Sequence, residues 1–140
     1  MRFDLTLTDA PNPDARAAIL RHLKAFNAQQ AGARDERPLA ILLTSPETGE
    51  ILGGLWGRTA LDWLFVELLF VPETLRGAGV GRDMMRRAEA EARARGCHGV
   101  WLDTFSFQAR GFYEKLGYTV FGTIDDFPVG HRRFFLKKPL

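Results

Sequence analysis

Cysteine is almost absent from this chain of 140 residues, since Cys97 is the only one. A single cysteine cannot form a disulfide within the chain, and with three scattered histidines it cannot build a Cys/His metal site. Disulfide-dependent proteins belong to oxidising compartments, so this composition favours the cytoplasm. We expect no bound metal.

Long hydrophobic runs are absent as well. No apolar stretch approaches the roughly 20 residues that a membrane-spanning helix needs. The first residues, Met1-Arg2-Phe3-Asp4, lack the hydrophobic segment of a secretory signal. We therefore expect neither a membrane partner nor export.

An excess of charge of one sign is also missing: 19 Lys and Arg balance 17 Asp and Glu, for a net charge of +2. The arginines are not interleaved with aromatic residues along one element, as a nucleic-acid surface would require. We expect no nucleic-acid partner. The length and the 46% hydrophobic content suit a single domain over residues 1–140.

Hydrophobic periodicity predicts the order β-α-β-β-β-α-β-α-β-β, which is an α+β arrangement. The predicted strands are residues 3–8, 38–45, 50–58, 61–71, 99–104, 118–124 and 132–137, and the predicted helices are 13–32, 83–95 and 108–116. Residues 33–37 are a loop or the remnant of a further helix. The segment 61–71 is apolar at both parities, so we expect a central strand that is buried on both faces.

A glycine-rich turn follows that strand, with Gly77, Gly79 and Gly81 between Arg76 and Arg82. Glycines let several backbone N–H groups converge, and the helix that follows adds the positive end of its dipole. The turn lacks the Lys-Ser/Thr ending of a P-loop and the third glycine of the dinucleotide fingerprint. Two interpretations stay open, a phosphate cradle and a plain strand-to-helix turn.

The pattern Arg76-x-x-Gly79-x-Gly81 after a Val-Pro strand end resembles the acetyl-CoA signature of the GCN5-related N-acetyltransferase (GNAT) superfamily. A second segment, Ala-Arg-Gly-Phe-Tyr-Glu-Lys-Leu-Gly-Tyr at residues 109–118, resembles a later motif of that family. The resemblance spans about residues 61–118. It implies a mixed, mostly antiparallel twisted sheet of about seven strands flanked by helices.

The same resemblance implies transfer of an acetyl group from acetyl-CoA to a primary amine by direct attack in a ternary complex. The alternative is a non-catalytic module that binds or senses acyl-CoA. The residues implied in cofactor binding are Leu69, Phe70, Val71, Arg76, Gly77, Ala78, Gly79, Val80, Gly81, Arg82, Ser106, Gln108 and Phe112. Ser106 stands where the family commonly has an asparagine, and Gln108 could substitute for it.

Glu67 and Tyr113 are the candidate catalytic residues. Glu67 is an acid inside a strand that is otherwise apolar, where an unpaired carboxylate is costly, so it is a candidate base, direct or through water. In the resembling family an acid near this position deprotonates the incoming amine. Tyr113 matches the family tyrosine that protonates the leaving thiolate, and its phenol has a reference pKa of about 10. The structural alternatives are a satisfied carboxylate and a packing aromatic ring.

The acceptor is a small-molecule amine or a protein amine, and the sequence does not choose between them. Candidates for its side of the site are Trp56, Trp63, Asp125, Asp126, Phe127 and His131. Many members of the resembling family are homodimers, and the oligomeric state is left open.

Overall fold

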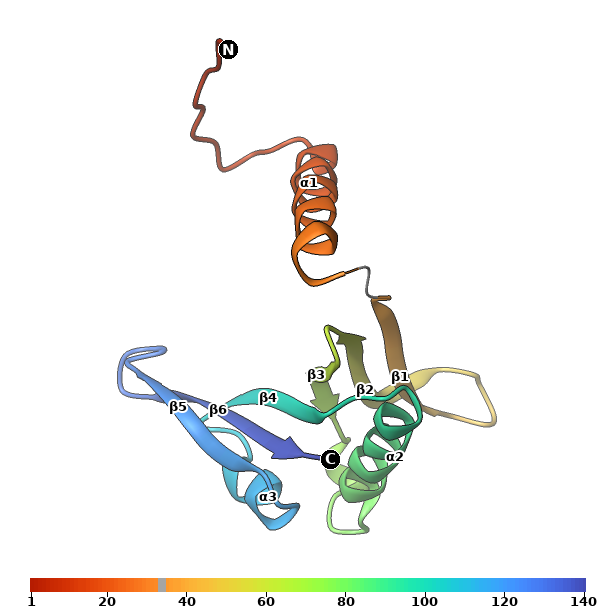
Figure 1. Ribbon diagram of the computed structural model, residues 1–140. Helices are drawn as coiled ribbons and strands as arrows, with labels where there is room; N and C mark the ends of the chain where they lie inside the picture. The colour runs from red at the N-terminus through yellow and green to blue at the C-terminus, as the bar shows by residue number, and fades with distance from the viewer. Residues whose placement is uncertain (33–34) are drawn as a thin grey trace. The chain divides into compact units, whose positions relative to one another are not determined.

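The computed structural model of the protein describes residues 1–32 and 35–140, and it divides into two units, residues 1–34 and residues 35–140. Each unit is described by itself below (Figure 1). The predicted loop or helix remnant at 33–37 lies partly outside the described residues. The expectation of a single domain over 1–140 stays a prediction.

Within its described residues, 1–32, the first unit holds one helix, α1 (Pro13–Ala31), as its sequence pattern predicts. The Asn12 side chain accepts a hydrogen bond from the Asp14 backbone N–H at 2.9 Å, and Pro13 occupies the first turn. The predicted strand at 3–8 is wrong, because these residues take no strand conformation in the described structure. Alternating side chains favour a strand, but a strand also needs a partner backbone to bond.

The second unit contains one six-stranded sheet. Its strands are β1 (Arg37–Thr44), β2 (Ile51–Ala60), β3 (Trp63–Phe70), β4 (Gly99–Phe105), β5 (Thr119–Asp125) and β6 (Arg132–Pro139). They lie in the order β1-β2-β3-β4-β6-β5, and every neighbouring pair is antiparallel except β3 with β4. The α+β fold class is therefore confirmed, with six strands instead of about seven.

The predicted strand 61–71 begins late, because its first two residues form a hairpin turn. Leu61 and Asp62 have φ values of 50° and 69°, and they join Ala60 of β2 to Trp63 of β3. Two left-handed residues between antiparallel strands make the turn that matches strand twist. Taken by itself, the second unit leaves part of β3 exposed, up to 61% for Leu68, so burial of this strand on both faces stays a prediction.

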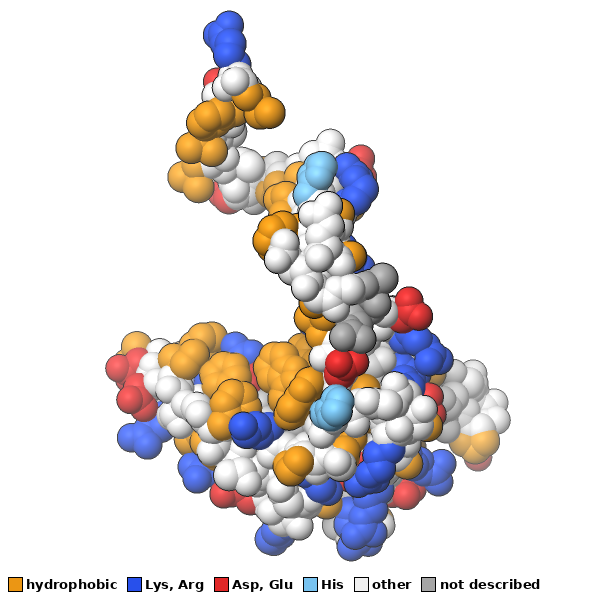
Figure 2. All heavy atoms as spheres, in the orientation of Figure 1, with side chains coloured by type: hydrophobic (Ala, Val, Ile, Leu, Met, Phe, Trp, Pro, Cys, Tyr) orange, Lys and Arg blue, Asp and Glu red, His pale blue; other side chains and the backbone are white. Residues whose placement is uncertain are grey.

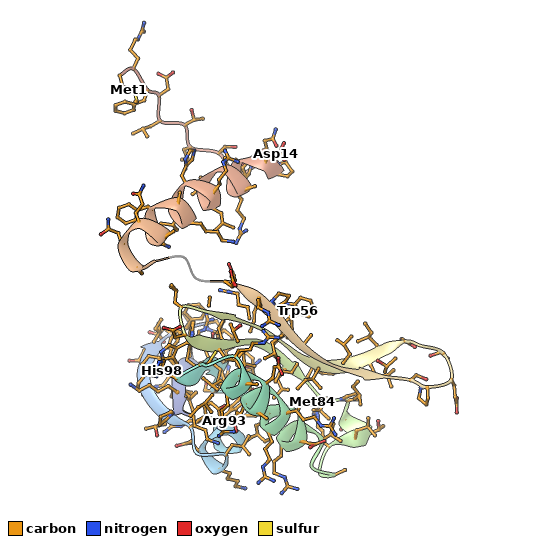
Figure 3. The ribbon with its side chains drawn as sticks, turned by 45° about the vertical axis from the view of Figure 1, so that its right-hand side comes forward. Met1, Asp14, Trp56, Met84, Arg93 and His98 are labelled. Atoms are coloured by element: carbon orange, nitrogen blue, oxygen red, sulfur yellow. The ribbon has the colours of Figure 1, made fainter. Side chains whose placement is uncertain are left out.

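Helices α2 (Val80–Ala94) and α3 (Arg110–Lys115) cover the same face of the sheet, and a short 3-10 turn, η1 (Glu73–Leu75), precedes α2 (Figure 1). Figure 3 shows α2 lying along the strands, with Met84 on this helix. The core between helices and sheet is apolar. Its largest fully buried side chains are Leu55, Leu64, Met85, Val100, Leu102 and Leu136.

One charged side chain lies inside this core. Glu89 of α2 is 4% exposed, and its carboxylate accepts hydrogen bonds from the Tyr118 hydroxyl at 2.7 Å and from Lys138 Nζ at 3.1 Å. Burial and this bond to Glu89 raise the pKa of the Tyr118 phenol. A buried carboxylate is tolerated when it is paired in this way, and here the pairing joins α2 to the C-terminal strands.

Figure 2 shows Lys and Arg side chains spread over the surface, with hydrophobic side chains gathered in places between them. Within residues 1–32 and 35–140, the structure contains no helix whose length and apolar character would let it cross a membrane.

Candidate active site

The site begins where the two parallel strands separate. β3 and β4 are paired from Trp63 with Gly99 to Val66 with Leu102, and their register stops there. β3 continues to Phe70 and β4 to Phe105 without pairing to each other. Backbone N–H and C=O groups on the facing edges are therefore left for another partner, which can be an extended chain of amides.

Glu67 lies at the start of this opening, on a β-bulge. Trp56 of β2 pairs with Leu68 and Gly57 pairs with Val66, so Glu67 is passed over in the register. The extra residue redirects the strand, as bulges beside functional sites often do. Within the second unit the Glu67 side chain is 47% exposed, and its Oε2 lies 3.7 Å from Arg58 Nη1.

Glu67 and Arg58 belong to the sheet face opposite the helices. The residues beside Arg58 in β2, Gly57 and Thr59, are buried toward α2, and the Arg58 guanidinium lies over the Phe65 ring at 5.0 Å. Phe65 in turn stacks on Trp101 of β4, with ring centroids 4.1 Å apart. A carboxylate on this face can meet a reactant that approaches from the side away from α2.

The glycine-rich turn lies beyond the carboxyl end of β3. Arg76 Nε donates a hydrogen bond to the Val71 carbonyl at 3.0 Å, which closes the loop before the turn, and its guanidinium lies 6.0 Å from the Phe70 ring centre. Gly77 and Gly79 have φ values of 82° and 81°, a left-handed conformation that favours glycine. The turn is thereby held in a shape that ordinary residues would strain.

Helix α2 begins inside the turn, three residues before its predicted start at 83. The first hydrogen bond of the helix runs from the Asp83 N–H to the Gly79 carbonyl at 3.0 Å. The N–H groups of the first turn before Asp83 therefore have no partner within the helix. No side chain among the described residues caps them. Free N–H groups and the helix dipole together suit an anion such as a phosphate.

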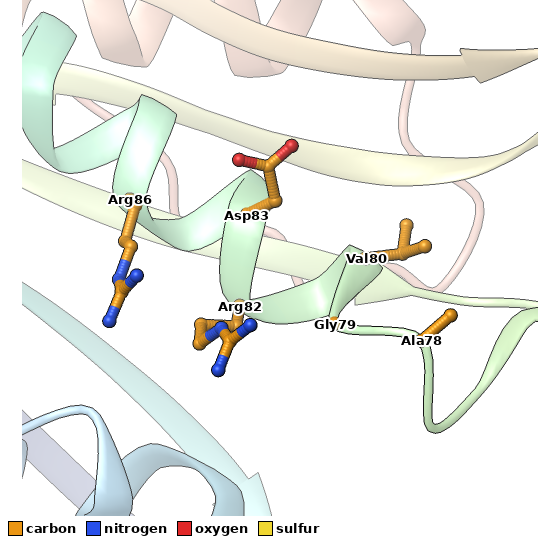
Figure 4. A pocket seen from close by; sticks show the side chains of 6 residues that line it. All are labelled: Ala78, Gly79, Val80, Arg82, Asp83 and Arg86. Carbon is orange, nitrogen blue, oxygen red and sulfur yellow. The ribbon is translucent and has the colours of Figure 1, made fainter.

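A hollow of about 300 Å³ opens at this helix start (Figure 4). Ala78, Gly79, Val80, Arg82, Asp83 and Arg86 line it. In Figure 4 the Arg82 and Arg86 side chains extend to the same side of α2, whereas Asp83 points away from them. Arg86 was not among the predicted cofactor residues, although its spacing of four from Arg82 is the signal that would have placed both on one face.

The two sequence motifs meet at Gly81. A Cβ added there would lie 3.2 Å from Phe112 Cζ and 3.6 Å from Val71 Cγ2. A space the size of one methyl group thus lies between the end of β3, the start of α2 and the start of α3. This contact shows that the segment at 109–118 packs against the cradle, although some thirty residues separate them in the chain.

Tyr113 is 8% exposed and lies beside two other rings, Phe112 at 5.0 Å and Tyr118 at 6.1 Å between centroids. Burial, helped by the negative charge of Asp103, raises the pKa of the Tyr113 phenol to about 12. The hydroxyl is therefore protonated throughout the neutral range. Tyr113 lies on the helix-covered face, so it and Glu67 approach the parted strands from opposite faces.

Ser106 and Gln108 are engaged within the protein. The Gln108 side-chain oxygen accepts bonds from Phe105 N–H at 2.8 Å and from the Thr104 hydroxyl at 3.2 Å, which fixes the β4–α3 turn. Ser106 Oγ accepts from Arg132 N–H at 3.0 Å and lies 3.2 Å from His131 Nδ1. These bonds join the β4–α3 turn to the start of β6.

Sequence reasoning missed a partly buried ion pair beside this turn. Arg133 Nε donates a hydrogen bond to Asp103 Oδ1 at 2.9 Å, and Arg133 Nη2 lies 2.8 Å from the same oxygen. Their positions 30 residues apart offered no local signal. Of the predicted acceptor-side acids, Asp125 is paired with Arg132 at 3.0 Å.

Among the described residues, no cluster of three or more His, Cys, Asp and Glu side chains is arranged to hold a metal ion.

Comparison with known proteins gives a consistent result. The family described as Acetyltransferase (GNAT) matches residues 5–118. An acetyltransferase of Agrobacterium fabrum is 38% identical over 97% of this chain and 98% of its own length. The blasticidin-S acetyltransferase of Streptomyces morookaense is 41% identical over 91% of this chain and 92% of its own.

A crystal structure described as an acetyltransferase from Agrobacterium tumefaciens has a TM-score of 0.93 and 37% identity, covering 99% of this chain and all of that one. The resemblance read from the two motifs is confirmed. The chain belongs to the GNAT acetyltransferase family and is an acyltransferase.

Proposed function

We propose that this acetyltransferase transfers the acetyl group of acetyl-CoA directly to a primary amine while both are bound. The observation that carries the proposal is the junction at Gly81, where the cradle turn, the parted end of β3 and the Tyr113 helix converge. An anion site, a free strand edge and a proton donor are then side by side. The anion site suits a pyrophosphate, the strand edge suits a pantetheine arm, and the proton donor suits a thiolate leaving group.

The residues present fit acetyl-CoA on physical grounds. A Cβ at Gly81 would fill the space against Phe112, and the uncapped N–H groups of α2 suit the pyrophosphate. Arg82 and Arg86 add positive charge on the same side of the helix. The unpaired edge of β3 from Leu69 to Val71 would bond the pantetheine amides, and an N–H near Leu69 would serve as the oxyanion donor.

Proton transfers are assigned to Glu67 and Tyr113. The Glu67 carboxylate takes a proton from the ammonium, directly or through water. The amine nitrogen then bonds to the thioester carbon as the carbon–sulfur bond breaks, and the second proton that the nitrogen loses passes to water. The Tyr113 phenol gives its proton to the departing sulfur. Its raised pKa of about 12 keeps that proton in place until negative charge develops on the thiolate.

The acceptor is a small-molecule amine or a protein amine. The relative named for blasticidin S supports including that antibiotic in any panel of amines, beside simple alkylamines, amino acids and a lysine peptide. Proximity of two bound reactants would supply much of the rate enhancement.

Thiol release from acetyl-CoA, measured with a thiol reagent across this panel, tests the proposal. We expect Tyr113→Phe to lower kcat by about 100-fold, the usual range for loss of a general acid, and to leave acetyl-CoA affinity unchanged. Glu67→Gln should lower kcat/KM at neutral pH, whereas Glu47→Gln, in the exposed β1–β2 turn, should not. Binding of acetyl-CoA without amine-dependent thiol release would contradict the reaction.

A further inference from the structure

Three phenylalanine rings gather where β4 ends and where the β5–β6 connection returns. Phe105 and Phe107 are stacked with centroids 5.2 Å apart and planes 9° from parallel, and Phe127 lies 5.5 Å from Phe105. We call these rings, together with the Arg133 guanidinium, the aromatic platform. Phe107 and Phe127 are 57% and 40% exposed, so two rings of the platform offer their surfaces to a ligand.

Arg133 packs against the rings of the platform, and its positive charge is already paired with Asp103. Its guanidinium lies 5.2 Å from the Phe105 ring and 5.0 Å from the Phe127 ring, a cation–π arrangement. The guanidinium is paired with the Asp103 carboxylate within the protein, and the two side chains are 28% and 15% exposed. The positive charge is thus neutralised locally, and the platform has no need of an anionic ligand.

The platform lies on the acceptor side of the site. Asp103 and Phe105 follow Leu102, the last residue of β4 that pairs with β3, so the platform begins where the strands part. Three residues of strand place Phe105 roughly 10 Å from that point. Phe105 and Arg133 are cross-strand partners, and they share the face that carries Trp101 and Phe65. That face is the one on which Glu67 lies.

We propose that the acceptor carries a flat aromatic or heteroaromatic ring, which stacks on the aromatic platform while its amine reaches the parted strands. This inference rests on the proposed function, because it names the substrate class of the same site. Flat rings stack on phenylalanine with a preference that saturated rings of equal size do not share. The neutralised Arg133 excludes a requirement for an acidic group on the ring.

The test compares 2-phenylethylamine and 4-phenylbutylamine with their cyclohexyl counterparts, which match them in size and amine but are not flat. Binding is measured by titration calorimetry in the presence of CoA, and turnover by thiol release. We expect the phenyl compounds to bind about 2- to 10-fold more tightly, the range that aromatic pairing supplies. Phe107→Leu and Phe127→Leu should abolish the preference and leave acetyl-CoA affinity unchanged.

Phe121→Leu is the matched control, since Phe121 is 53% exposed on β5 and is not part of the platform. Equal binding of phenyl and cyclohexyl compounds, or a preference that survives both platform variants, would overturn this inference and leave the acetyl transfer standing. Failure of every amine to release thiol from bound acetyl-CoA would instead refute the proposed function.

Discussion

Adding one methyl group at Gly81 tests whether the contact between the cradle and α3 matters for the donor site. In Gly81→Ala, the new Cβ would lie 3.2 Å from Phe112 Cζ and 3.4 Å from Cε1, closer than comfortable carbon contacts. Gly81 is in α2 and has no positive φ, so the helix itself would gain up to about 1 kcal/mol from alanine. Overpacking a filled space costs about 1–3 kcal/mol, so we expect a net loss of about 0–2 kcal/mol.

The Phe112 ring must shift by a few tenths of an ångström to relieve the contact. We expect that shift to be passed on to α3 or to the first turn of α2, which disturbs the cradle. We expect acetyl-CoA affinity in Gly81→Ala to fall about 10-fold, equivalent to about 1.4 kcal/mol. Titration calorimetry with acetyl-CoA and a thermal melt measure the two effects separately.

Gly111→Ala is the matched control for this variant. Gly111 precedes Phe112 in α3 and has no positive φ, and no atom of the described residues lies within 4 Å of the position of an added Cβ. It should therefore bind acetyl-CoA like the parent and melt a few degrees higher, because alanine is the better helix former. Parent-like affinity in Gly81→Ala would refute the argument that this contact shapes the donor site.

Three further predictions concern the same unit. Arg82→Ala and Arg86→Ala should each weaken acetyl-CoA binding about 3- to 10-fold. Neither variant should weaken binding of acetyl-pantetheine, which lacks the pyrophosphate. Arg87→Ala, whose side chain pairs with Asp83 at 3.2 Å, should leave the affinity for both ligands unchanged. Gly57→Ala should destabilise the protein by about 3 kcal/mol or more in urea melts, because its Cβ would collide with the Phe65 carbonyl oxygen. Gly122→Ala should be nearly neutral, because its Cβ would make an ordinary contact with Phe135 Cβ at 3.9 Å. The pKa of Tyr113 is raised to about 12 in the folded protein from about 10 in the unfolded chain. The contribution of Tyr113 to stability is therefore intact below pH ~10 and is lost as the pH rises toward ~12. Tyrosinate absorbance of Tyr113 that appears near pH ~10 in the folded protein would contradict this.

Much of the fold was predictable because its signals are local. Asn12 and Pro13 mark the start of α1, and the glycines at 77–81 mark the turn before α2. Leu61 gave no such signal, since leucine rarely adopts a left-handed conformation, and Asp62, which tolerates it, stands inside a run that is mostly apolar. The turn was therefore read as part of an apolar strand.

Part of the candidate site was likewise predictable from local signals, and part was not. The two motifs predicted the cradle and Tyr113, but the exposure of Glu67 depends on a bulge set by the pairing of β2 with β3. The bond between Arg133 and Asp103 joins residues on different strands. Phe112 and Gly81, which lie close together, belong to different helices. Contacts of this kind follow from tertiary packing, which periodicity along one segment does not encode.

Hydrogen exchange of the backbone amides, with and without acetyl-CoA, tests most directly the claim that the donor binds between the cradle turn and the parted strands. We expect slower exchange in residues 77–82 and in residues 69–71 at the end of β3 when acetyl-CoA is added. Acetyl-pantetheine should protect residues 69–71 alone. Protection confined to other parts of the chain, with these two segments unchanged, would contradict this placement of the donor.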